Sequence, residues 1–187
     1  FLPLYNNQKD IASIYSIDGV TFYCGLWNGK LLVYDYKKNR SKEFNIGFEQ
    51  SPIFAFETYA KDQLLVGSFG EGALILNTTE LKNGTDTEIF LKGYQINEIV
   101  KQNDSSIWFA TETGVVNYLK GENSFEYYTS SSTSDAGLLH DNVSDIMLDH
   151  EGRLWAATRK GLNLFDFNTK KFVPLDEPSE LADKWIT

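Results

Sequence analysis

Eight residues of the sequence have side chains that are suited to hold or attack a ligand. They are two aromatic rings, an amide, two carboxylates, an imidazole and two cations: Trp27, Phe69, Asn28, Glu71, Glu112, His140, Arg159 and Lys160. Small-molecule sites combine aromatic surfaces with a few convergent polar groups, so this set predicts binding of a sugar-like ligand. The alternative is that these residues are solvated tips of surface turns. Trp27 is the strongest candidate, because a ring in a turn has little reason to be there for packing.

Glu71 and Glu112 also permit a different chemistry. Two carboxylates that flank a glycosidic bond are the machinery of most glycoside hydrolases. Exposed carboxylates are common in this chain, however, which has 26 Asp and Glu against 17 Lys and Arg. We therefore expect no catalytic residue, and we keep a carbohydrate-active hydrolase or lyase as an alternative.

Charge and cysteine content restrict the partners further. The net charge of -9 repels phosphate backbones, so nucleic acid is not an expected partner. Cys24 is the single cysteine, and no Cys/His spacing fits a zinc site, so neither a metal nor another cofactor is expected. No apolar run approaches the roughly 18 residues of a membrane-spanning helix.

The elements that must position the eight residues belong to a repeat. Aromatic residues make up 14% of the 187 residues, which favours β-strands. Four segments share a strand that ends in a small residue, a short gap, a glycine and a second strand. The small residues are Gly25, Gly67, Ala110 and Ala157, spaced by 42, 43 and 47 residues, and the glycines are Gly29, Gly72, Gly114 and Gly161.

Each copy has an alternating apolar segment before it and an aromatic strand after it, which gives four strands per unit. A period of about 43 residues with four strands predicts an all-β protein made of β-propeller blades. The small residue allows neighbouring blades to approach closely, and the glycine allows the positive φ of a tight hairpin. Trp108 and Trp155 are predicted to fill the space between blades.

The expected organisation is one propeller segment over residues 1–187. The blade units lie at approximately 11–50, 53–92, 96–129 and 143–175, with flanking blade edges at 1–7 and 183–187. A ring of four blades is uncommon, so we expect a piece of a larger, seven-bladed propeller. In an up-and-down blade, the turn between the second and third strands shares a face with the link to the next blade. The eight candidate residues are therefore expected near one mouth of the propeller, the face on which these turns and links lie.

The fourth unit resembles the two-component regulator propeller repeat. The resemblance rests on Val-Ser-Asp-Ile-Met-Leu-Asp-His-Glu-Gly-Arg-Leu-Trp-Ala-Ala-Thr-Arg-Lys-Gly-Leu-Asn-Leu-Phe-Asp at residues 143–166 and on the lead-in Gly-Leu-Leu-His-Asp-Asn at 137–142. The resemblance covers all four units unevenly: the third unit also has the Trp, the small residue, the Thr and the Gly in register, whereas the first two units keep mainly the glycines.

That family implies the periplasmic sensor region of a hybrid two-component system histidine kinase of Bacteroidetes. It implies detection of an oligosaccharide, a homodimer in the parent protein, and partners in the remaining blades and the kinase. It also implies contact with the membrane only through the parent chain. A scaffold propeller that binds another protein is a further alternative.

Overall fold

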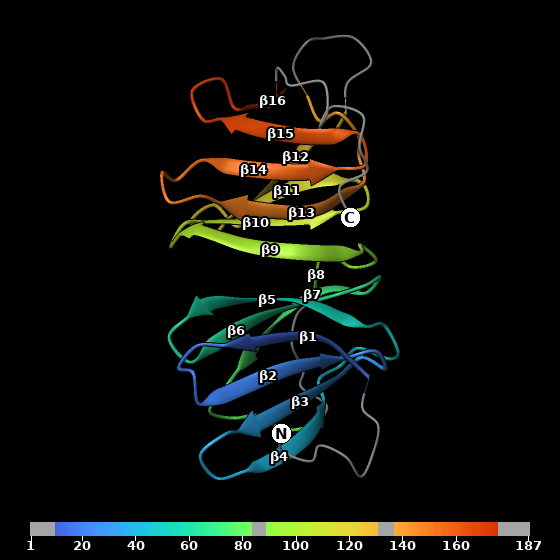
Figure 1. The fold of residues 1–187 in the computed structure, drawn as a ribbon, viewed down its shortest axis with the longest axis vertical. Coiled ribbons are helices and arrows are strands. Elements are labelled where there is room, and N and C mark those ends of the chain that lie inside the picture. Colours follow the sequence, from blue (N-terminus) through green and yellow to red (C-terminus); the bar gives the residue numbers. More distant parts are fainter. Residues whose placement is uncertain (1–9, 84–88, 131–136, 176–187) are drawn as a thin grey trace. The chain divides into compact units, whose positions relative to one another are not determined.

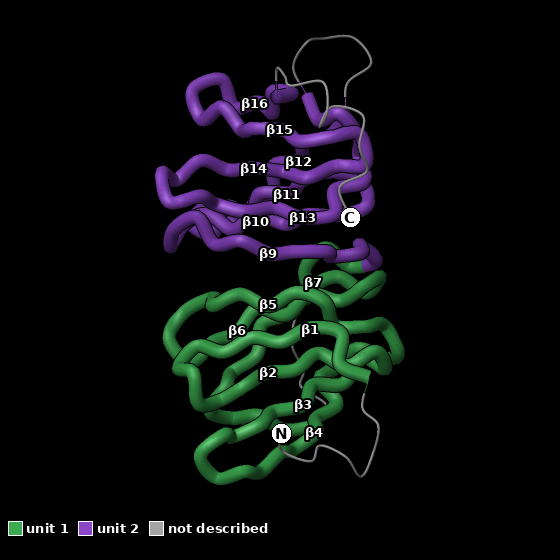
Figure 2. The backbone as a smooth tube through the Cα atoms, in the orientation of Figure 1, with its two compact units in different colours: residues 1–92 green, residues 93–187 purple. Residues whose placement is uncertain are grey.

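The computed structural model describes residues 10–83, 89–130 and 137–175, and their regular elements are strands alone (Figure 1). The strands form four sheets, each with four antiparallel strands in chain order. This confirms the predicted all-β class and the four-stranded blades. The predicted blade edges at 1–7 and 183–187 lie outside the described residues. The chain divides into two compact units, residues 1–92 and 93–187 (Figure 2).

Unit 1 contains the first two sheets, which we call blades 1 and 2. Blade 1 consists of β1 (Ile11–Ser16), β2 (Thr21–Leu26), β3 (Lys30–Asp35) and β4 (Arg40–Asn45). Blade 2 consists of β5 (Ile53–Ala60), β6 (Gln63–Ser68), β7 (Gly72–Asn77) and β8 (Ile89–Phe90).

Unit 2 contains blades 3 and 4. Blade 3 consists of β9 (Ile96–Asn103), β10 (Ser106–Thr111), β11 (Gly114–Leu119) and β12 (Ser124–Tyr128). Blade 4 consists of β13 (Val143–Leu148), β14 (Leu154–Thr158), β15 (Gly161–Asp166) and β16 (Lys171–Pro174).

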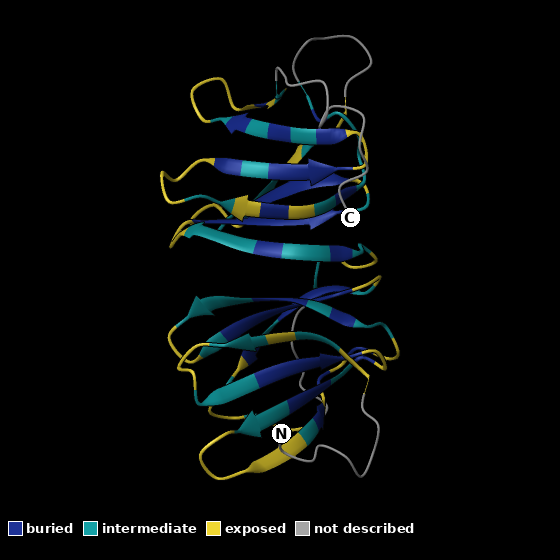
Figure 3. Ribbon diagram, in the orientation of Figure 1, coloured by how far each residue is buried: buried dark blue, intermediate teal, exposed yellow. Residues whose placement is uncertain are grey.

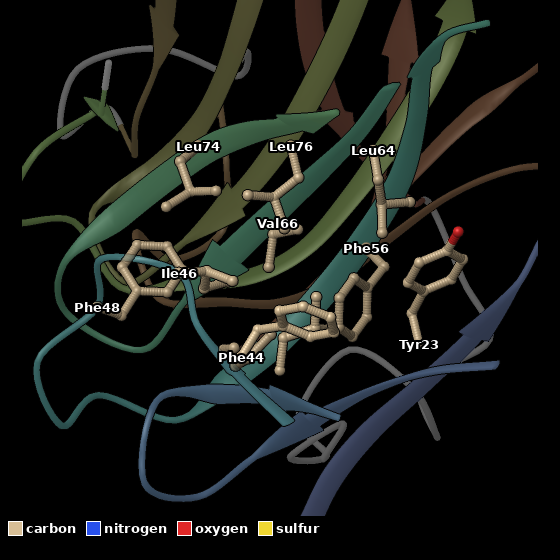
Figure 4. Close-up of a cluster of buried hydrophobic side chains, with 11 residues drawn as sticks. Tyr23, Phe44, Ile46, Phe48, Phe56, Leu64, Val66, Leu74 and Leu76 are labelled. Atoms are coloured by element: carbon tan, nitrogen blue, oxygen red, sulfur yellow. The ribbon is translucent and has the colours of Figure 1, made fainter. Parts of the chain in front are cut away.

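The core of unit 1 lies between its two blades. Tyr23 and Phe44 of blade 1 meet Phe56, Leu64 and Val66 of blade 2 (Figure 4). Burial of such side chains contributes about 1.5–3 kcal/mol each, so this contact stabilises the pair of blades.

The predicted close approach at the small residue is confirmed at Gly25. A Cβ at this position would overlap the backbone oxygen of Ile53 in blade 2 and come within 2.8 Å of the Ile53 Cβ. The hydroxyl of Ser13 also donates a hydrogen bond to the Ile53 carbonyl at 2.6 Å. Backbone therefore packs on backbone at this point, which only a residue without a side chain permits.

Unit 2 repeats this arrangement with larger rings. Trp108 is 1% exposed, and its ring lies 4.8 Å from Phe165 and 6.4 Å from Phe172 of blade 4. The side-chain amide of Asn97 donates to the Val143 carbonyl at 2.6 Å, at the position where Ile53 accepts in unit 1. The predicted role of Trp108 between blades is confirmed.

For Trp155 the same role stays a prediction, because this residue is partly buried in β14, a strand that Figure 3 colours buried and intermediate. Successive residues of a strand point to opposite faces, and Leu154 and Ala156 are the residues of β14 that pack against blade 3. Trp155 lies on the other face of the blade. The described part of the chain holds no sheet after blade 4 to cover that face.

A β-bulge interrupts the first strand of every blade at the same place. The ladder skips one residue between Ile11 and Ser13, and the matching residues of the other three blades are skipped in the same way. The unpaired residues are Ala12, Phe54, Asn97 and Ser144. Bulges redirect a side chain at the edge of a sheet. The side chain of Asn97 uses this to bond to Val143 of the next blade, and that of Phe54 uses it to contact two aromatic rings.

Candidate functional site

In every blade the turn between the second and third strands is bonded to the segment that leads into the blade. The bonds are Trp27 N–H to Asp10 O at 3.0 Å, Phe69 N–H to Pro52 O at 2.8 Å, Gln95 N–H to Glu112 Oε2 at 2.8 Å, and Arg159 N–H to Asn142 O at 3.2 Å. Turn and link therefore share one face within each blade, as the up-and-down topology predicts. We call this face the mouth of the blade.

A buried hydroxyl shapes three of these turns. Ser68, Thr111 and Thr158 are each 0% exposed. Each donates to the carbonyl of the turn glycine, namely Gly72 at 3.1 Å, Gly114 at 2.8 Å and Gly161 at 2.8 Å. Each also accepts a backbone N–H from the turn, from Glu71 at 2.9 Å, Thr113 at 3.2 Å and Lys160 at 3.2 Å. The hydroxyl thereby holds the turn that carries the candidate residues.

Three aromatic rings meet at the mouth of unit 1. The ring of Trp27 lies 5.4 Å from that of Phe54, and the ring of Phe54 lies 5.1 Å from that of Phe69, both edge to face. Trp27 is 54% exposed and Phe69 is 41% exposed. Two of the predicted binding residues are thus joined, and we call Trp27, Phe54 and Phe69 the aromatic platform.

Phe54 is the member that the sequence analysis missed. It is the unpaired residue of the bulge in β5, where Ile53 pairs with Ser68 and Ala55 pairs with Gly67. A bulge alters the alternation of faces along a strand. An aromatic residue between two inward-facing residues is the one signal in the sequence that points to it.

Glu71 joins the turn that carries Phe69 to the link between blades 1 and 2 by hydrogen bonds. Its carboxylate accepts the backbone N–H groups of Glu49 at 3.0 Å, Ser51 at 3.2 Å and Gln50 at 3.4 Å. Burial acts to raise the pKa of Glu71, but the hydrogen bonds from Glu49, Ser51 and Gln50 outweigh it and hold the pKa below its ordinary value. The carboxylate stays ionised, which is the opposite of what a general acid of a glycosidase needs.

The turn of blade 1 rests on the same link. Asn28 Oδ1 accepts the N–H of Lys30 at 3.2 Å, so Asn28 shapes its own turn. Gly29 has φ +76°, and a Cβ there would lie 3.1 Å from the Ser51 carbonyl oxygen. Phe48 of the link is 1% exposed in the core below. The link therefore packs on the core through Phe48 and is also contacted by the turns of both blades.

The remaining candidates lie in unit 2. Glu112 is occupied by its bond to the Gln95 N–H. His140 Nδ1 accepts the N–H of Asn142 at 2.9 Å, so this histidine shapes the link into blade 4. Arg159 and Lys160 form the exposed turn between β14 and β15. The structure thus gathers Trp27, Asn28, Phe69 and Glu71 in unit 1 and places the other four candidates in unit 2.

Within residues 10–83, 89–130 and 137–175, no three His, Cys, Asp or Glu side chains are grouped so that they could hold a metal ion. The same residues contain no helix with the length and apolar character needed to cross a membrane.

Comparison with known proteins identifies the repeat. Residues 137–160 match the two component regulator propeller family. The chain is 24% identical over 198 residues to histidine kinase P4 of Formosa agariphila, and the match covers 95% of this chain but 14% of that protein. The chain thus spans a small part of the curated relative.

Solved structures of similar fold include propeller domains. The extracellular domain of a putative hybrid two-component system from B. thetaiotaomicron matches with a TM-score of 0.68 at 16% identity, over 92% of this chain and 25% of that one. The β-propeller domain of Cps50 (Swd1) from Myceliophteria thermophila matches with a TM-score of 0.70 at 15% identity, over 97% and 58%. Residues 137–160 therefore resemble the two component regulator propeller repeat, and the chain resembles in fold the extracellular domains of hybrid two-component systems.

Proposed function

We propose that this chain is part of the periplasmic sensor of a hybrid two-component system and that its aromatic platform contacts an oligosaccharide. The observation that carries the proposal is the exposure of Trp27 and Phe69 beside Phe54 at the mouth of unit 1. The family match and the likeness to extracellular domains support the sensor part of the proposal.

The platform has the properties of a preformed binding surface. Its three rings come from two turns and one bulge. Both turns are fixed by hydrogen bonds or backbone packing on the link at residues 48–52, and the bulge is held by the ladder between β5 and β6. Little conformational entropy is lost when a rigid aromatic surface binds a ligand. Rings of this kind cover the apolar face of a sugar, while carbonyls and amides of the link pair with its hydroxyls.

Signal transmission follows from ligand-dependent preference between two arrangements of the parent protein. A ligand shifts such an equilibrium only by its difference in affinity for the two states. We propose that the bound oligosaccharide favours one arrangement of two protomers and thereby changes the activity of a histidine kinase elsewhere in the parent chain.

The test is calorimetric titration of the 187-residue chain with a panel of glycan fragments, compared with Trp27→Ala. We expect one class of fragment to bind. Trp27→Ala should lower the affinity for that fragment at least tenfold, because the largest ring of the platform is lost. Tyr36→Ala is the matched control, since Tyr36 is 59% exposed at the opposite end of the blade, beyond β3. Failure of every fragment to bind, or to raise the melting temperature, would overturn the proposal.

A further inference from the structure

A fixed negative charge lies beside the aromatic platform. The Glu71 carboxylate is held against the N–H groups of residues 49–51, and Glu71 follows Phe69 by two residues in the same turn. The turn that carries Trp27 packs on the same link, because Gly29 faces the Ser51 carbonyl. The charge of Glu71 is therefore held at the link on which both turns rest.

Other charges at this mouth add to the effect. Asp10 and Glu49 are exposed, and the Asp10 carbonyl accepts the N–H of Trp27. Lys30, at the start of β3, is a cation of the same mouth. Its Nζ lies 2.9 Å from Glu43 Oε1, so its charge is paired with a carboxylate. Lys92, exposed on the segment that follows β8, is a cation that opposes this charge, and the exposed carboxylates of Asp10 and Glu49 outnumber it.

We infer that the aromatic platform selects uncharged saccharides over saccharides that carry sulfate or uronate groups. This inference rests on the proposed function and narrows its ligand class. Sugar hydroxyls donate hydrogen bonds to carboxylates and carbonyls, whereas sulfate and carboxylate groups bring a like charge beside Glu71 and Glu49. Salt screens the repulsion between exposed charges. The Debye length, beyond which the repulsion is largely lost, is about 30 Å at an ionic strength of 0.01 M and about 3 Å at 1 M. The discrimination should therefore depend on ionic strength.

The experiment uses matched pairs of neutral gluco-, galacto- and xylo-hexasaccharides and their sulfated forms. Each is titrated into the chain in 10 mM and in 500 mM NaCl, with tryptophan fluorescence and calorimetry as readouts. For the sugar backbone that binds, we expect the neutral form to bind at least about fivefold more tightly in 10 mM NaCl. The ratio should fall to about twofold in 500 mM NaCl.

A charge variant separates electrostatics from shape. Glu49→Lys should narrow the ratio of the two affinities in 10 mM NaCl by at least threefold, because it replaces a like charge with a cation beside the bound sulfate. Glu80→Lys is the matched control, because Glu80 is exposed at the opposite end of blade 2 and should leave the ratio unchanged.

Each outcome separates this inference from the proposed function. Equal or tighter binding of the sulfated form, lost in Trp27→Ala, overturns the ligand class and leaves the oligosaccharide sensor standing. Binding that Trp27→Ala does not affect overturns the platform as the site. If no member of the panel binds in either salt concentration, the proposed function fails and this inference fails with it.

Discussion

The carboxylate of Glu71 accepts the backbone N–H of Ser51 at 3.2 Å, although Glu71 lies in the turn of blade 2 and Ser51 in the link that precedes that blade. This bond joins the support of Phe69 to the segment on which the turn of Trp27 also rests. Glu71 is therefore a positioning residue of the platform, and its chemistry can be tested apart from ligand binding.

Glu71 should make the stability of unit 1 depend on pH. Its folded pKa lies below its ordinary value of 4.5, so its contribution is fully present above that value and is lost as pH falls through the folded pKa. We expect the urea midpoint of the wild type to fall more steeply below pH 4.5 than that of Glu71→Gln. Parallel curves for the two proteins from pH 3 to pH 7 would contradict this account.

Gly25→Ala should destabilise unit 1 by about 2–3 kcal/mol, since the new methyl group would overlap the backbone of Ile53 and force the blades apart. Urea denaturation measures the change. The control is Gly19→Ala, because a Cβ at Gly19 meets nothing within 4 Å and the cost there is only that of its φ of +68°. A smaller loss at Gly25 than at Gly19 would show that the blades are not in close contact at that point.

Substituting alanine for each of the two tryptophans at matching positions should lower the free energy of unfolding by different amounts. Trp108→Ala removes a ring that is 1% exposed and surrounded by Phe165, Phe172 and Tyr128, and should cost about 3–5 kcal/mol. Trp155→Ala removes a partly buried ring and should cost about 1–2 kcal/mol. Chemical denaturation of both variants checks the order, and equal losses would mean that the outer face of blade 4 is covered as fully as that of blade 3.

Thr158→Val tests the buried hydroxyl beneath a turn. The substitution keeps the shape but leaves the Gly161 carbonyl and the Lys160 N–H without the partner they have now. We expect a loss of about 1–3 kcal/mol. Thr158→Ser retains the hydroxyl and should recover most of the stability, so an equally unstable serine variant would assign the effect to the methyl group instead.

The fold was predictable from the sequence because its causes are local and periodic. The small residue and the turn glycine recur in all four units, and Gly29, Gly72, Gly114 and Gly161 all have positive φ. Alternating apolar residues then fix which face of each strand is buried.

The site was predictable only in part. Trp27 and Phe69 stand in turns whose position follows from the repeat, so their shared mouth could be expected. Phe54 could not, because a bulge depends on pairing that a single strand does not reveal. The task of Glu71 was also hidden, since its partners are backbone N–H groups, which every residue except proline carries.

The bulge at the start of each blade has a consequence for how such proteins diversify. Its extra residue takes no part in the ladder, so its side chain can change while the pairing on either side is kept. The four positions hold a methyl group, a phenyl ring, an amide and a hydroxyl, at Ala12, Phe54, Asn97 and Ser144. At Phe54 this position lies in the aromatic platform, so its side chain can vary while the ladder on either side is kept, whereas at Asn97 the same position supplies the hydrogen bond to Val143 between two blades.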